Sequence, residues 1–346
     1  MNEPETLPGS VTVLYSELLQ NCIHPLSDGA NVSFKSKTIG GRRYWYLYIS
    51  VGSSRREHYL GEESDQLLDR IADERALWEA NEDDRTLRAR LVRSLIAGGM
   101  PALNRDEGKV LALLERSGVF LAGGVLVGTL AFRAYANMLG VRWSSAVATQ
   151  DVDSAADNRY TLALPNEKKP INLPQVILDS GLGFFAVPAL DRRRPSTSFK
   201  IRGREFRIDV LAPMRGRNTS RPVQLKDFKA CAEPVRWLDY VLQDIQPVVL
   251  LYRHGILINV PAPGRFAVHK CVVSQRRPAA QAVRTRKDLD QAAAVFKVLL
   301  QDRPGDIQLA LEAAERQGES FMVGFQAGLA MLDRAVADGV RELGPG

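Results

Sequence analysis

The sequence predicts an α+β protein: a mixed sheet with flanking helices, a small N-terminal β-rich module and a helical C-terminal part. Three observations indicate this class. Residues 32–61 alternate two kinds of side chain with period 2, as strands do. Residues 62–96 repeat apolar side chains at helical spacing. Short apolar runs then alternate with helical segments up to about residue 260.

The length and composition of the chain are typical of a globular protein, and its net charge favours an anionic partner. At about 150 residues per domain, 346 residues predict two or three compact units. Apolar residues make up 45% and charged residues 25%, which excludes a long disordered chain. The formal net charge of +6 favours an anion but does not say which one. Cys22, Cys231 and Cys271 show no metal or disulfide spacing, so we expect ordinary thiols in a reducing cytosol.

Targeting signals are not visible in the sequence. The first ten residues are acidic and polar, unlike a signal peptide, and no run of 18 or more apolar residues occurs. We therefore expect a cytoplasmic protein without a membrane partner.

The N-terminal elements follow from these patterns in order. A short helix is expected first, then three antiparallel strands joined at Gly40-Gly41 and Gly52-Ser53-Ser54, then a helical stretch that Gly98-Gly99-Met100-Pro101 ends. The expected ranges are 11–19 for the first helix, 32–39, 42–51 and 55–60 for the strands, and 62–96 for the helical stretch. This gives a β-rich accessory module over 1–61 and a helical connection over 62–100.

The remaining elements divide at Pro261-Ala262-Pro263-Gly264. Before it we expect strands at 119–127, 199–201, 206–211, 248–251 and 256–260, and helices at 106–117, 130–139 and 226–242. After it the pattern is helical to the end, with a break near Arg303-Pro304-Gly305. The chain thus divides into a sheet domain over 101–262 and a helical region over 263–346.

A glycine turn at 128–129 is the first chemical signal. The apolar run 119–127 leads into Gly128-Thr129 and then into a helix, so backbone N–H groups and a hydroxyl meet at a helix N-terminus, which suits phosphate. Residues 123–129 also resemble part of a P-loop. They lack the lysine that should follow the second glycine, so we reject that interpretation.

Three aspartates form the second signal. Asp151 and Asp153 are two residues apart, so on an extended segment both carboxylates point to one side and can share a hard cation. Asp209 lies inside the apolar strand 206–211, where a charge is costly unless it is paired or metal-bound. With the Gly-Thr turn, this set matches what two-metal phosphoryl or nucleotidyl transfer requires.

These residues resemble the hG[GST]…DxD…hDh pattern of the DNA-polymerase-β-like nucleotidyltransferases. The sequence is also similar to a little-characterised bacterial family of this fold, with a P-E-R-[FY]-A-[VLI]-H-K segment and an R…K-D-L-x-Q-A segment. Here these read 263–270 and 286–292, so the resemblance covers about residues 100–300. Abortive-infection and toxin–antitoxin nucleotidyltransferases have a similar late lysine and aspartate in their active sites.

The resemblance implies roles for individual residues. Asp151 and Asp153 would hold the metals, Asp209 would complete the second metal site and activate the acceptor hydroxyl, and Lys270 would neutralise the triphosphate. Asp288 would either orient Lys270 or assist the acceptor. Two features depart from the pattern: Asp151 follows the Gly-Thr pair by 22 residues rather than about a dozen, and Gly264 replaces a glutamate at a position expected to be a turn.

Basic residues gather in three stretches. One is the N-terminal sheet, where bases and aromatic residues interleave as in nucleic-acid-binding surfaces, and the candidates are Arg42, Arg43, Tyr44, Tyr46 and Arg55. Half-buried packing of the aromatic residues is the alternative, and an exposed tyrosine face would favour binding. The other stretches are 191–226 and 276–287, which are either anion-binding surfaces or solvated charged segments.

These inferences together predict Mg²⁺-dependent transfer of a nucleoside monophosphate from an NTP to a hydroxyl. Two Mg²⁺ ions are expected, with Mn²⁺ as the alternative. RNA is the first choice of acceptor, especially a tRNA 3′ end, and a protein or a small molecule is the alternative. Other hypotheses are a toxin-like enzyme that blocks translation and a catalytically inactive protein of this fold that binds nucleic acid or regulates. The oligomeric state is not indicated.

Overall fold

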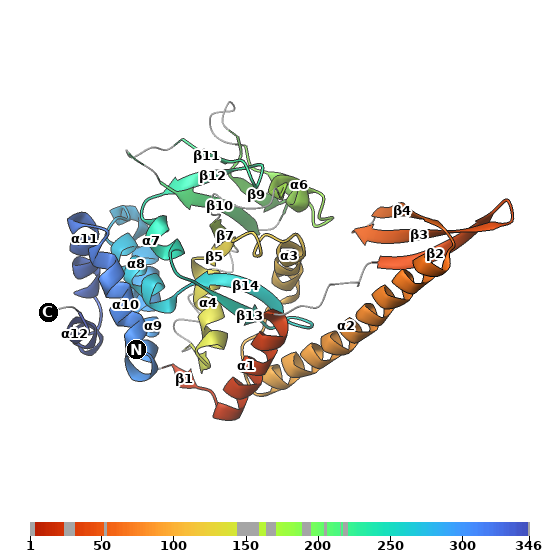
Figure 1. Ribbon diagram of the computed structural model, residues 1–346. Coiled ribbons are helices and arrows are strands. Elements are labelled where there is room, and N and C mark those ends of the chain that lie inside the picture. The colour runs from red at the N-terminus through yellow and green to blue at the C-terminus, as the bar shows by residue number, and fades with distance from the viewer. Residues whose placement is uncertain are drawn as a thin grey trace.

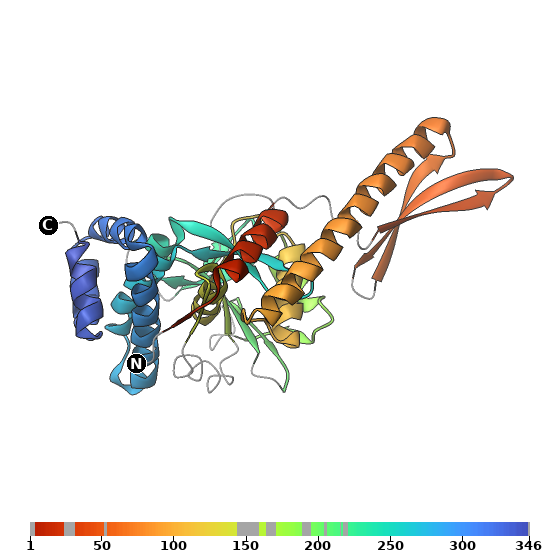
Figure 2. The ribbon, with the colours of Figure 1, turned by 90° about the horizontal axis from the view of Figure 1, so that it is seen from below.

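The structure is a computed structural model that describes residues 4–23, 32–51, 54–143, 159–163, 171–188, 195–203, 206–214, 216 and 221–344. Figure 1 shows a central body built on β-sheets, a group of helices toward the C-terminus, and an arm made of one long helix and a small sheet. Figure 2, turned by 90°, shows the same arm projecting from the body. The mixed sheet, its helices and the N-terminal strands confirm the predicted α+β class.

The largest sheet carries the candidate site. Its main path is β11–β12–β10–β7–β5, and β9 pairs with both β10 and β8. β10 is parallel to β7 and β12 and antiparallel to β9, while β5 is antiparallel to β7. The strands are β5 (Val125–Val127), β7 (Arg159–Ala163), β8 (Phe184–Ala186), β9 (Ser198–Ile201), β10 (Arg207–Pro213), β11 (Val223–Leu225) and β12 (Ala230–Val235).

β10 has two different faces because its residues alternate with period 2. Ile208, Val210 and Ala212 are buried on one face, whereas Asp209 and Leu211 are half-buried on the other. β9 pairs with the first three residues of β10, and β12 pairs with its last three, so the two strands share one edge of β10. Asp209 therefore lies in the half of β10 that β9 borders.

The arm consists of β2 (Val32–Ile39), β3 (Arg42–Val51), β4 (Ser54–Glu62) and the 33-residue helix α2 (Asp65–Ala97). The strands form an antiparallel sheet in the order β2–β3–β4. The Ser64 side chain caps α2 by accepting a hydrogen bond from the Leu67 N–H. The Arg75 guanidinium of α2 lies 5.7 Å from the centre of the Trp45 ring, so α2 covers the Trp45 face of the sheet.

The inner end of α2 joins the body through a second apolar cluster. Leu18 of α1 (Gly9–Ile23), Leu95 of α2 and Val249 of β13 are fully buried there. β13 (Ile245–Leu250) and β14 (Ile256–Pro261) form an antiparallel hairpin. The short strands β1 (Glu5–Thr6) and β6 (Val141–Arg142) pair nearby.

Helices surround the sheets and form the C-terminal part. Those in the body are α3 (Arg105–Arg116), α4 (Thr129–Met138), α6 (Leu173–Leu178) and α7 (Leu238–Leu242). The C-terminal ones are α8 (Pro263–Ser274), the 3-10 turn η2 (Ala279–Gln281), α9 (Ala282–Asp302), α10 (Pro304–Glu315), α11 (Glu319–Leu329) and α12 (Arg334–Glu342). The predicted break near Pro304 is confirmed, because proline is favoured at the first position of a new helix.

Two element predictions are wrong. Residues 226–242 were expected to be one helix, but they form β12 followed by the short helix α7. Alternating burial along β12 and the presence of Pro234, which cannot continue a helix, explain the difference. The run 119–127 is a strand only at 125–127, because a turn with Gly123 at φ +88° precedes it.

Along the described ranges, no helix is both long enough and apolar enough to cross a membrane.

Candidate functional site

The Gly128-Thr129 turn joins β5 to α4. Gly128 has φ +70° and ψ −145°, a combination that is essentially restricted to glycine, and it directly precedes the first residue of α4. The first-turn N–H groups of a helix have no partner within the helix, so they are available to an anion. Neither Gly128 nor Thr129 is fully buried. The turn therefore has the backbone geometry that a phosphate-binding turn requires.

Asp209 is held on β10 by two polar neighbours. Its Oδ1 accepts hydrogen bonds from the Ser198 hydroxyl at 2.5 Å and from the Arg207 Nε at 2.7 Å. Arg207 also donates to the Ser198 Oγ at 2.8 Å, so the three side chains form a closed triangle. The Asp209 side chain is 15% exposed. Among the described residues only Oδ1 has hydrogen-bond partners, which leaves Oδ2 available to a further ligand.

The sheet register places Asp209 near the glycine turn. Thr161 of β7 pairs with Asp209 on one side and with Val127 on the other. Asp209 and Val127 are thus two strands apart, a separation of about 10 Å at ordinary strand spacing. Gly128 directly follows Val127, so the sheet brings the turn and the carboxylate toward the same end of two strands that β7 separates.

The other two predicted metal ligands, Asp151 and Asp153, lie outside the described residues. Among the residues that the structure does describe, no group of three His, Cys, Asp or Glu side chains could hold a metal ion. One donor in the described ranges suits a hard cation, because the second carboxylate oxygen of Asp209 has no protein partner there. In sequence, Asp151 and Asp153 shortly precede β7, the strand next to β10.

Lys270 and Asp288 contact each other. Lys270 Nζ on α8 lies 2.6 Å from Asp288 Oδ1 on α9, and Arg277 Nε lies 2.5 Å from Asp288 Oδ2. The Asp288 side chain is only 4% exposed. Burial alone would raise the pKa of Asp288, but the Lys270 and Arg277 charges hold that pKa below its ordinary value. Of the two roles left open for Asp288, this geometry favours the orientation of Lys270.

Lys270 also contacts an aromatic residue of its own helix, one turn earlier. Its ammonium lies 5.3 Å from the centre of the Phe266 ring. Phe266 packs in turn on Tyr135 and Phe132 of α4, with ring centres 5.1 and 6.4 Å apart. The part of the chain that the structure describes gives Lys270 no hydrogen bond or ion pair with Asp209, and its predicted contact with a triphosphate stays a prediction.

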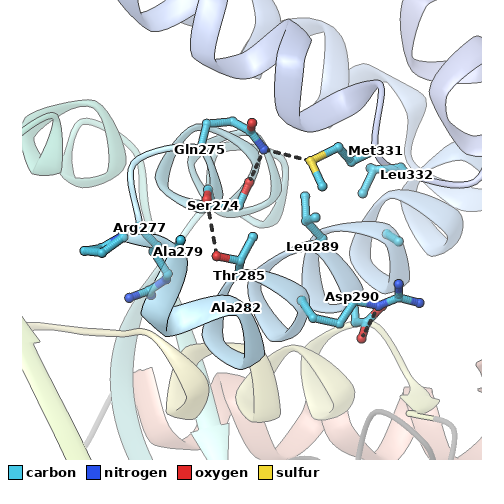
Figure 3. A pocket seen from close by; sticks show the side chains of 13 residues that line it. Ser274, Gln275, Arg277, Ala279, Ala282, Thr285, Leu289, Asp290, Met331 and Leu332 are labelled. Atoms are coloured by element: carbon cyan, nitrogen blue, oxygen red, sulfur yellow. Dashed lines mark hydrogen bonds and ion pairs between the residues drawn. The ribbon is translucent and has the colours of Figure 1, made fainter.

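A pocket of about 510 Å³ opens beside this ion cluster, between α8, η2, α9 and the turn before α12. In Figure 3, Arg277 lies at one side of the pocket and Asp290 at the other. Asp290 forms an ion pair with Arg286, which also lines the pocket. Leu289 and Met331 contribute apolar surface. The volume is in the range of small-molecule sites. Because Arg277 both lines the pocket and binds Asp288, a ligand here would be coupled to the environment of Lys270.

The structure corrects the expectation for Gly264 and agrees with that for His269. Gly264 was expected to be a turn, but it is buried in the first turn of α8. A Cβ at Gly264 would lie 2.4 Å from the Asp306 carbonyl oxygen, so close packing on α10 explains why a glutamate is absent. His269 is half-buried, and its pKa is lowered to about 4 by burial and by the Lys270 charge, which agrees with a packed neutral residue.

The sheet of the arm has an open face that carries tyrosines and lysines. We call this the tyrosine face; register pairs Lys37 with Tyr44, and Tyr46 with both Lys35 and Tyr59. Tyr59 is 60% exposed, and α2 covers the opposite face of the sheet. Tyr44 and Tyr46 are half-buried, so the alternative of half-buried packing holds for these two candidates, and nucleic-acid binding at this face stays a prediction.

The five predicted nucleic-acid residues do not all lie on this face. Tyr44 and Tyr46 do, with ring centres 6.2 and 5.5 Å from that of Tyr59. Arg42 and Arg43 instead pair with Glu62 and Glu63 at 3.5 and 3.4 Å, so their charges are already compensated. The side chain of Arg55 lies outside the part that can be described.

The structure adds three polar residues to the candidate site: Ser198, Arg207 and Arg277. Arg207 and Asp209 are two residues apart on one strand, so period 2 alone places them on the same face. Ser198 and Arg277 carry no comparable signal, because strand pairing brings Ser198 to Asp209 and helix packing brings Arg277 to Asp288.

Comparison with known proteins identifies one match. A family described as Nucleotidyltransferase matches residues 105–315, which include β5, α4, β10, α8 and α9. No curated protein and no solved structure matches the chain.

Proposed function

Because the chain belongs to this nucleotidyltransferase family, we propose that it transfers a nucleoside monophosphate from an NTP to a hydroxyl in a Mg²⁺-dependent reaction. The observation that carries the proposal is the placement of Asp209 two strands away from the Gly128-Thr129 turn. Asp151, Asp153 and Asp209 would hold the metal. When bound, the cations would neutralise charge on the phosphate oxygens.

The chain's own residues then have separate tasks. The Gly128-Thr129 turn binds the phosphates through N–H groups at the start of α4. Asp209 accepts the proton of the acceptor hydroxyl, whose oxygen bonds to the α-phosphorus while the bond to the bridging oxygen breaks and pyrophosphate leaves. Arg207 compensates the charge of Asp209 while no cation is bound, since its Nε lies 2.7 Å from the carboxylate. Lys270, oriented by Asp288, supplies positive charge near the phosphates.

We propose RNA as the acceptor. The tyrosine face supports this choice, because the exposed ring of Tyr59 can stack on an unpaired base and the exposed Lys35 attracts the backbone, while Lys37 is already paired with Glu57. The arm projects from the body, so it could hold an RNA whose end reaches the sheet (Figures 1 and 2). A tRNA 3′ end is the first substrate to test.

The decisive experiment supplies each α-labelled NTP with Mg²⁺, first with total RNA and then with a protein fraction. We expect label in RNA, and no label with Asp151→Asn/Asp153→Asn. The control is Asp69→Asn/Asp73→Asn, which removes two exposed acids from α2. Full activity of the Asp151/Asp153 variant would refute the proposal. Label in protein bands alone would refute the choice of RNA, and RNA binding without Mg-NTP binding would identify an inactive member of the family.

A further inference from the structure

Two arginines surround one tryptophan next to α7. The guanidinium carbon of Arg276 lies 4.1 Å from the centre of the Trp237 ring, and that of Arg236 lies 4.7 Å from it. The two charges are therefore at most about 9 Å apart. Neither guanidinium forms an ion pair within the described ranges; Arg276 donates only to the Ser320 hydroxyl, at 3.1 Å. We call Arg236 and Arg276 the arginine pair.

This arrangement is electrostatically unfavourable without an anion. Burial and the nearby charge of Arg236 both lower the pKa of Arg276, which is the effect expected of two cations held close together. Stacking on an indole offsets part of the repulsion. Carboxylates occur nearby in sequence, at Glu233, Asp239 and Glu319, but none of them pairs with either arginine.

The backbone at Trp237 is also unusual. Its φ is +60°, a left-handed conformation that costs a bulky residue about 1–2 kcal/mol. The ring is nonetheless fixed: Trp237 is only 9% exposed, and its edge packs on Phe321 with ring centres 5.3 Å apart. The two exposed guanidinium groups are thus presented on a rigid platform.

The arginine pair belongs to the same side of the sheet as Asp209. Leu238, which follows Trp237, packs in one cluster with Val127 and Leu211. Leu211 shares a strand face with Asp209, two residues away. Trp237 is two residues past Val235, which pairs with Pro213, so it lies about 13 Å or more along the sheet from Asp209.

From this placement we infer that the arginine pair binds a phosphodiester of the RNA acceptor, at about 13 Å or more along the sheet from Asp209. The inference rests on the proposed function for its choice of ligand. Guanidinium groups bind phosphate oxygens in a bidentate manner, and two of them around one platform can hold successive phosphates. Because the two arginines cover the indole ring, the ring cannot stack on a base. The site therefore contacts the phosphate backbone of the RNA and does not recognise the base.

The test measures RNA affinity as a function of salt. Each phosphate contact on single-stranded nucleic acid contributes a slope of about −0.7 to log K against log salt. Arg236→Gln/Arg276→Gln should therefore reduce the steepness by about 1.4, and weaken binding at least about 10-fold at low salt. The readout is fluorescence anisotropy of a labelled single-stranded RNA with the full-length protein.

Two further variants make the result specific. Arg316→Gln/Arg341→Gln removes the same net charge from the C-terminal helices without touching Trp237, and should leave the slope unchanged. Arg236→Lys/Arg276→Lys keeps the charge, so it should retain the slope and lose part of the affinity. Equal slopes for wild type and the Arg236/Arg276 glutamine variant would overturn the inference. So would an effect of that variant on NTP binding alone.

The same measurements separate this inference from the proposed function. If wild type labels RNA and the glutamine variant keeps its slope, the inference fails while the function stands. If no NTP is used but RNA binding still depends on the arginine pair, the function fails while the binding site stands. If wild type does not bind RNA, both the inference and the choice of acceptor are wrong.

Discussion

Asp209 and Asp288 are both carboxylates paired with bases, yet their surroundings differ. Asp288 is 4% exposed, and both of its oxygens bind cationic side chains from α8 and the segment after it. Asp209 is 15% exposed, and among the described residues only one of its oxygens is bound, by a serine and by an arginine that is itself 34% exposed. A saturated, buried carboxylate stabilises packing, whereas one with a free oxygen can exchange its partner for a ligand.

The largest expected effect is the loss of activity on Asp209→Asn. An amide cannot accept the hydroxyl proton and is a weaker cation ligand, so NMP transfer should fall about 1,000-fold, or about 4 kcal/mol. The assay is single-turnover labelling of RNA. Asp288→Asn, measured at a temperature where it remains folded, should keep far more of the activity. Comparable losses of NMP-transfer activity in the Asp209 and Asp288 variants would contradict the different roles assigned to the two carboxylates.

Asp288→Asn should have the largest effect on stability. The change leaves Lys270 and Arg277 without their shared counter-charge in a buried position, which typically costs about 3–5 kcal/mol. Urea unfolding at pH 7 measures this loss. Since the pKa of Asp288 is lowered in the folded state, wild type should also lose stability as pH falls through that pKa, and Asp288→Asn should not.

Glu115 extends the comparison, because it is a half-buried carboxylate that forms no ion pair with any residue that the structure describes. It accepts a hydrogen bond from the Leu257 N–H at 2.7 Å, and burial raises its pKa to about 7 from 4.5. The Glu115 carboxyl binds its proton more tightly in the folded than in the unfolded state. The loss of this proton should therefore lower the free energy of unfolding of wild type by about 3 kcal/mol between pH 4.5 and 7.

Glu115→Gln tests that expectation. Glutamine keeps the acceptor oxygen and carries no charge, so the variant should lose this pH dependence and be more stable than wild type above pH 7. Urea unfolding from pH 4.5 to 8 is the measurement. Parallel stability curves for the two proteins would contradict the assigned pKa.

The smallest expected effect is that of Asp209→Asn on stability. The ion pair with Arg207 is partly exposed, so its loss should change the free energy of unfolding by less than about 1 kcal/mol. Thermal unfolding without added metal measures this. A loss as large as that of Asp288→Asn would mean that Asp209 serves the fold and not the reaction.

The sequence alone determined several local features. Period 2 at 42–51 predicted the strand that carries Tyr44 and Tyr46, and the glycine at 128 predicted a turn between a strand and a helix. An aspartate inside an apolar strand identified Asp209 as a costly charge that needs a partner. These signals are readable because strand period, turn conformation and charge burial depend on neighbours within a few residues.

Only the tertiary structure decided which distant groups meet. Asp288 finds Lys270 and Arg277 because α8 and α9 pack together, and Asp209 finds Ser198 through an antiparallel register. The same holds for Trp237, whose arginine neighbours are separated by about 40 positions in the sequence and whose own segment was predicted to be helical. Local pattern fixes the direction in which a side chain points, but the partner it reaches depends on how whole elements pack, which no short stretch of sequence encodes.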